Sequence, residues 1–195
     1  MNYNPTKHHR RSIRLNGYDY SQAGLYFITI CVQGRCYLFG EIVDGEMILN
    51  DAGRMVEKEW LELPKRFSNI HLYEYVVMPN HFHAIVEIVG ATLVVALSKT
   101  FAPNGELLQP ALLGQPQGIA PTTKPKTIGE MVGAFKSIAT VEYIRGITQM
   151  GWQPFPGKLW HRNYYEHIIR NEKSLIKITE YIINNPSNWD DDSLR

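Results

Sequence analysis

The stretch LYEYVVMPNHFHAIVEIV, residues 72–89, decides the fold because it contains two strands and the turn between them. Each half is rich in β-branched and aromatic residues, and a Pro-Asn pair separates the halves. Side chains of a strand alternate between two faces, so His81 and His83 share one face while Phe82 points to the other. The sequence therefore predicts an antiparallel pair of strands with two imidazoles side by side.

Further strands are expected before this stretch. Residues 25–32, LYFITICV, are β-branched and aromatic, and residues 36–42 and 45–50 follow after short breaks that contain glycine. The Asp44-Gly45 pair is a strong hairpin signal. These segments predict consecutive antiparallel strands.

Residues 51–67 fit a helix that lies between the two groups of strands. Asp51 is a possible N-cap, and Met55, Trp60 and Leu61 are available for a buried face.

Two more helices are expected in the second half of the chain. Thr127 and Glu130 form a capping box, and apolar residues then recur at helical spacing. Asn171 can cap a last helix, which must end near Pro186. The apolar stripe of that helix is Leu175, Ile178 and Ile182. Residues 158–169, KLWHRNYYEHII, fit a short strand or an ordered connection.

The order of these elements predicts an α+β fold in which helices pack on an antiparallel sheet. At 195 residues the chain is long enough for one core, so we expect a single domain over residues 1–195. Residues 91–126 are rich in proline and show no periodicity, which indicates an insertion or a long flexible loop. Residues 1–20 form a basic N-terminal arm.

Composition limits where the protein acts. No segment resembles a signal peptide or is apolar enough to span a bilayer, so we expect a cytoplasmic protein without a membrane partner. Cys31 and Cys36 have the wrong spacing for a zinc knuckle and are better explained by packing. The net charge is only +1, so a nucleic-acid-binding surface would have to be local.

The His-hydrophobic-His pattern suggests a metal site. The Cβ atoms of His81 and His83 should lie roughly 7 Å apart, which lets both rings reach one ion. Imidazole ligands suit Mn, Zn, Fe or Co, while phosphate oxygens in a mixed site would admit Mg. Taken alone, the pattern also fits two strand histidines without any ligand role. The chain is too short for the large barrels of about 250 residues that carry similar motifs in metal-dependent hydrolases.

Four segments in order carry a resemblance to a known family. Residues 73–86, YEYVVMPNHFHAIV, resemble the HUH motif of single-tyrosine transposases, specifically the REP-associated tyrosine transposases. Residues 10–42, the segment GAFKSIAT at 133–140, and residues 160–186 agree with the same family. The resemblance implies a ferredoxin-like or RRM-like HUH nuclease fold.

The position of Tyr181 distinguishes it from the other tyrosines. On the last helix it lies at the polar edge of the apolar stripe, with Asn185 one turn further on. The resemblance implies that Tyr181 is the catalytic nucleophile and Asn185 the third metal ligand, although Asn184 is adjacent. Tyr164 and Tyr165 lie in strand-like or turn sequence and are interpreted as packing or base-stacking residues.

The resemblance implies a metal-dependent single-stranded DNA endonuclease and strand transferase that forms a 5′-phosphotyrosine. Its cofactor would be Mg or Mn, its partner single-stranded or hairpin DNA, and its state a monomer or a homodimer. Candidate phosphate contacts are Arg10, Arg11, Arg14 and Lys177, with Tyr18 and Tyr20 as stacking residues. The arm could equally be a solvated tail. Two other functions fit the sequence: a nucleic-acid-binding module that does not cut, and a metal hydrolase that uses water.

Overall fold

A computed structural model describes residues 17–89 and 126–195. It contains a four-stranded antiparallel sheet in the order β4-β5-β1-β6. The strands are β1 (Gly24–Cys31), β4 (Ile70–Val77), β5 (His81–Ile88) and β6 (Tyr165–Ile169). This arrangement confirms the α+β class and the antiparallel sheet. The expected strand within residues 158–169 is β6, at the edge of the sheet.

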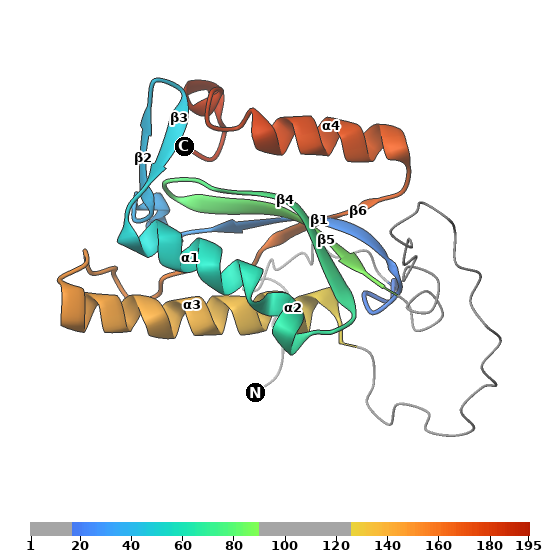
Figure 1. Cartoon of the computed structure of the whole chain (residues 1–195), viewed down its shortest axis with the longest axis horizontal. Helices are drawn as coiled ribbons and strands as arrows, with labels where there is room; N and C mark the ends of the chain where they lie inside the picture. The colour runs from blue at the N-terminus through green and yellow to red at the C-terminus, as the bar shows by residue number, and fades with distance from the viewer. Residues whose placement is uncertain (1–16, 90–125) are drawn as a thin grey trace, which may run out of the picture.

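Helices cover both faces of the sheet (Figure 1). They are α1 (Asp51–Leu61), α2 (Leu63–Arg66), α3 (Ile128–Met150) and α4 (Glu172–Ile183). Helices α1, α2 and α3 lie on one side of the sheet, and α4 lies alone on the other. The expected capping box of α3 is present, and Asn171 caps α4 as predicted. No helix among the described residues is long and apolar enough to cross a membrane.

The hydrophobic interior is split by the sheet into two clusters. The large cluster lies between the sheet and the helices α1 and α3, and it contains Phe82, Trp60 and Phe135. The small cluster lies under α4 and contains Phe27, Ile85, Ile169 and Ile182. Because strand residues alternate, the side chains of β5 divide between the two clusters as the sequence predicts.

The prediction of a strand over residues 36–42 is wrong for residues 36–39. Residues 36–39 form no strand, and the structure instead has a separate hairpin of β2 (Gly40–Val43) and β3 (Glu46–Leu49). The backbone N–H groups of Leu38 and Phe39 donate to the carbonyl of Pro79, while both side chains are buried in the large cluster. Buried backbone donors need a partner, and this carbonyl supplies it in place of a neighbouring strand. Consecutive pairing with β1 is therefore also wrong, since β1 pairs with β5 and β6.

The helix expected over residues 51–67 is divided in two. Its N-cap is Asn50, whose side chain accepts from the N–H of Gly53 at 2.9 Å, and not Asp51. The second part, α2, starts after a break next to Pro64. Proline has no N–H to donate to the preceding turn, so the helix cannot continue unchanged. Leu61, expected on the buried face, is 49% exposed.

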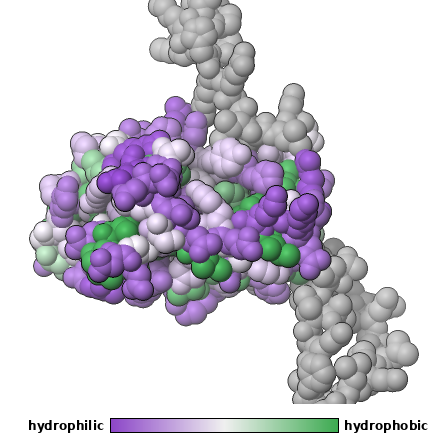
Figure 2. Space-filling model, turned by 90° about the horizontal axis from the view of Figure 1, so that it is seen from above, coloured by the Kyte–Doolittle hydropathy of each residue, from purple (hydrophilic) through white to green (hydrophobic). Residues whose placement is uncertain are grey.

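Seen from the α4 side, hydrophilic residues cover most of the surface and hydrophobic residues form separate patches (Figure 2). The arm residues Arg10, Arg11 and Arg14 lie outside the described part of the chain. Of the insertion at residues 91–126, only Lys126 is described.

Close packing of α3 gives a test of the fold. A Cβ on Gly146 would lie 2.1 Å from the ring of Trp152, whereas a Cβ on Gly133 of the same helix would meet no atom within 4 Å. We expect Gly146→Ala to lower the free energy of unfolding by about 1–3 kcal/mol through overpacking. Gly133→Ala should raise it by roughly 0.5–1 kcal/mol, because alanine favours the helix. Urea denaturation of both variants checks this, and equal effects would contradict the packing described.

Candidate active site

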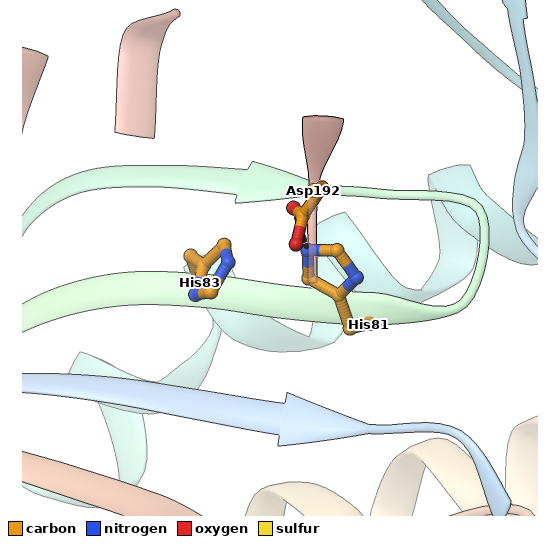
Figure 3. A group of neighbouring side chains, drawn as sticks. All are labelled: His81, His83 and Asp192. Atoms are coloured by element: carbon orange, nitrogen blue, oxygen red, sulfur yellow. Dashed lines mark ion pairs between the residues drawn. The ribbon is translucent and has the colours of Figure 1, made fainter. Parts of the chain in front are cut away.

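The site lies on the sheet face that α4 covers. His81 and His83 project from β5 on this face, with their ring centroids 4.6 Å apart. Figure 3 shows both rings on one side of the strand and the carboxylate of Asp192 directed at His81. The antiparallel register places Thr29 of β1 beside His83. The two histidines are 0% and 1% exposed, so their hydrogen-bond partners determine their tautomers and which ring nitrogens can bind a metal ion.

The hydrogen bonds of Asn80 fix the tautomer of His81. The side-chain Nδ2 of Asn80 donates to the carbonyl of Leu194 at 2.9 Å, so its Oδ1 must be the atom that faces the imidazole. An amide oxygen only accepts, and therefore the Nδ1–H of His81 donates to it over 2.8 Å. The Nε2 of His81 is left with a buried lone pair and no hydrogen-bond partner among the described residues. A metal-binding histidine usually donates its other ring N–H to a fixed acceptor, as the Nδ1–H of His81 does here to Asn80.

His83 is held in the same manner from β1. Its Nδ1 lies 2.8 Å from the hydroxyl of Thr29, and its Nε2 lies 3.2 Å from the hydroxyl of Tyr181. The ring of Tyr181 meets both His83 and Phe27 edge-on. The phenol of α4 is thus in direct contact with the histidine pair.

Burial keeps both imidazoles neutral. It lowers the pKa of His81 to about 4, against the opposing charge of Asp192, and it lowers the pKa of His83 well below its usual range. Neutral imidazole is the form that binds metal ions. Burial and the charge of Asp192 also raise the pKa of Tyr181, so the phenol is protonated at neutral pH.

Asp192 comes from the segment that follows α4. Its carboxylate lies 3.6 Å from the Nε2 of His81, and ligand atoms of His81, His83 and Asp192 all lie within 4.8 Å of one another. The N–H of Leu194 donates to Asp192, as does the side-chain amide of Asn185 at 3.1 Å. His81, His83 and Asp192 therefore form a group that can hold a metal ion.

Asp192 is a residue of the site that was not predicted from the sequence. The signal was the acidic run Asp190, Asp191 and Asp192 that closely follows the Asn-Pro of the last helix. Only the fold brings one member of that run to the histidines, through the short helix η2 (Trp189–Asp191). Trp189 of this turn stacks on His81 with ring centroids 5.9 Å apart and so fixes the turn over the site.

Asn185 also faces the site. It is 2% exposed, and its Oδ1 is buried with no hydrogen-bond partner among the described residues. Asn184 is exposed and forms the C-cap of α4, so of these two asparagines it is Asn185 that contacts the site, through Asp192. The unsatisfied atoms of His81 and Asn185, together with a carboxylate, form a mixed nitrogen and oxygen donor set. Such a set fits a divalent cation of the Mn or Mg type.

Other expected residues lie farther from this group. Lys177 is exposed on α4 one turn before Tyr181. Tyr18 and Tyr20 pack against the large cluster and each other, with ring centroids 4.9 Å apart, so they are not free stacking residues. Tyr164 is partly buried against the same cluster, whereas Tyr165 is 53% exposed.

A cleft of about 500 Å³ opens beside Tyr181. Its wall includes Phe27, Thr29, His83, Asn163, Tyr165 and Tyr181. The site thus combines a buried donor group, a phenol in contact with it, and an adjoining open space.

Known proteins share this fold. A solved structure of a REP-associated tyrosine transposase bound to a REP hairpin aligns with 92% of this chain and 74% of its own, at a TM-score of 0.53 and 15% identity. The chain has the REP-associated tyrosine transposase fold. In this chain the histidine pair on the central strand β5 lies beneath α4, which carries Tyr181.

One relative is similar along its sequence. An uncharacterized protein of Haemophilus influenzae is 40% identical over 195 residues, which cover 98% of this chain and 96% of the relative. The two proteins belong to one family. No family model matches the chain.

Proposed function

We propose that the protein is an HUH single-tyrosine transposase, which nicks and joins single-stranded DNA with Tyr181 as the nucleophile. The observation that carries this proposal is the 3.2 Å contact between the hydroxyl of Tyr181 and His83, within the group that can hold a metal ion. A binding module without chemistry has no need of a phenol placed on buried, neutral histidines. Perturbed groups gathered at one cleft are typical of catalytic sites.

His81 and His83 would hold the metal ion through nitrogen, with Asp192 and Asn185 as the oxygen donors. A divalent cation held there would polarise the scissile phosphate and favour loss of the phenol proton. Asn80 and Thr29 orient the two imidazoles through their Nδ1 atoms. With its proton on Nδ1, His83 offers one lone pair on Nε2, which can accept from Tyr181 or bind a cation. A cation bound there would therefore free the phenol for attack.

The reaction then follows from the position of the phenol. Attack forms a bond between the Tyr181 oxygen and phosphorus and breaks the bond to the 3′ oxygen. The proton that the phenol loses is matched by the one that the 3′ oxygen gains. The products are a 5′-phosphotyrosine and a free 3′ hydroxyl, and reversal by another 3′ hydroxyl joins two strands without ATP.

Hairpin DNA with unpaired flanks is the substrate that we propose, because the similar transposase structure holds a REP hairpin. Unpaired nucleotides can bring a phosphate to a cleft that a duplex would not enter. Arg10, Arg11 and Arg14 of the basic arm and Lys177 on α4 are the proposed phosphate contacts.

The test is formation of a covalent adduct. The protein is incubated with end-labelled hairpin DNAs that carry randomised stems and flanks, with Mn²⁺ or with EDTA. We expect a labelled band that survives denaturation, requires the cation, and disappears after protease treatment. Cleavage without a protein-linked band would instead identify a hydrolase that uses water, and retarded but uncut DNA would identify a binding module.

A further inference from the structure

The cleft beside Tyr181 is bounded by elements that the proposed chemistry does not use. One side is formed by Tyr165 of the edge strand β6 and by His161, Asn163 and Tyr164 before it. The other side includes Ser193 and Leu194. At about 500 Å³ the cleft is in the size range of small-molecule sites. Since Tyr181 and His83 also line it, anything bound there must adjoin the reacting phosphate.

Strand register places an exposed aromatic ring in this cleft. Thr29 of β1 pairs with His83 on one side and with Tyr165 of β6 on the other, so the three side chains form a row across the sheet. Neighbouring strands are about 4.8 Å apart, which puts Tyr165 roughly 10 Å from His83. Tyr165 is 53% exposed and lines the cleft. Its ring is an exposed aromatic surface on the same sheet face as the histidine pair.

The segment before β6 is held rigidly. Lys136 of α3 donates to the carbonyls of His161 at 2.7 Å and Arg162 at 3.2 Å. The N–H of His161 donates to the carbonyl of Cys31 at 2.8 Å, and Trp160 bridges to Val32. The next residue, Asn163, therefore presents its side chain from a fixed backbone.

Asn163 supplies the polar group of the cleft. It is exposed, lines the cleft, and forms no side-chain hydrogen bond with the rest of the described chain. A carboxamide both donates and accepts, which is the property needed to read the edge of a base. An aromatic face with a nearby amide is the usual arrangement for holding an unpaired base.

We propose that this cleft binds the unpaired base of the nucleotide adjoining the scissile phosphate, stacked on Tyr165 and read at its edge by Asn163. The inference rests on the proposed function and adds to it the residues that choose the position of the cut. The strand then enters the site with one base anchored, which brings the neighbouring phosphate to Tyr181.

The test uses the full chain and the adduct reaction with the randomised hairpin pool and Mn²⁺. Adducts are isolated under denaturing conditions, and the DNA on both sides of the cut is sequenced. We expect wild-type protein to show a strong base preference at one position next to the cut. Asn163→Ala should flatten the preference at that position alone. Tyr165→Ala should lower the adduct yield at limiting DNA about tenfold, as loss of a stacking contact does.

Two controls separate stacking from folding. Tyr165→Phe keeps the ring and should give a yield close to that of the wild type. Tyr73→Ala removes an exposed tyrosine from β4, the opposite edge strand, and should change neither yield nor preference.

An even base distribution next to the cut, or a preference that Asn163→Ala leaves unchanged, would overturn the inference while the adduct itself upholds the proposed function. Complete absence of adduct would overturn both.

Discussion

Tyr181→Phe is expected to abolish the covalent adduct, with a loss of about 10³-fold or more. The substitution removes only the hydroxyl that lies 3.2 Å from His83. The ring keeps its edge contacts with Phe27 and His83, and the residue is 44% exposed, so the fold should persist. The measurement is the yield of protein-linked DNA under denaturing conditions, together with fluorescence anisotropy to verify that DNA binding remains.

Tyr164→Phe is the matched control for this experiment. Tyr164 is partly buried against the large cluster and lines the same cleft, so its variant tests whether any phenol of the cleft can form the adduct. Its variant should form adduct at close to the wild-type yield. If adduct persisted in Tyr181→Phe and vanished in Tyr164→Phe, the assignment of the nucleophile would be wrong.

His81→Ala should remove high-affinity binding of Mn²⁺ or Co²⁺. Loss of a partner outside the ligand set commonly costs 10- to 100-fold in metal affinity, so loss of a ligand should cost at least about 100-fold. Wild-type protein should gain thermal stability in the presence of the cation, since a ligand at 100 times its Kd stabilises by about 2.7 kcal/mol. This gain should disappear in the variant. Calorimetric titration at neutral pH and thermal melts with and without Mn²⁺ check both expectations.

Asn185 and Asp192 can be separated by the same titration. Asp192→Asn removes a negative charge that lies 3.6 Å from His81, and Asn185→Ala removes a neutral amide. We expect Asp192→Asn to weaken cation binding more, because a carboxylate attracts a divalent cation more strongly than an amide oxygen does. The opposite order would identify Asn185 as the stronger oxygen ligand, as the resemblance implies. Unchanged affinity in His81→Ala would instead argue against a metal site on β5.

Local pattern was sufficient to predict the strand pair around the histidines. Alternation along residues 81–88 fixed which side chains share a face, and the structure confirms it for His81, His83 and Phe82. The capping box at Thr127 was likewise readable because its partners are three residues apart. The position of Tyr181 off the apolar stripe needed only the helical period.

Features that depend on distant contacts could not be predicted in this way. Residues 36–39 have the composition of a strand, but their backbone partner is the carbonyl of Pro79, about forty positions away. Asp192 reaches His81 only because the chain turns back over the sheet after α4. The cleft beside Tyr181 is assembled from β1, β5, β6 and the C-terminal residues, which no local period connects.

The unequal division of the interior separates folding from chemistry. The large cluster under α1 and α3 contains most of the buried side chains and dominates stability, whereas α4 rests on Phe27, Ile85, Ile169 and Ile182. Substitutions around the helix that carries Tyr181 can therefore alter what is recognised while the rest of the molecule stays folded. During evolution, residues around α4 can therefore change without changes in the large cluster.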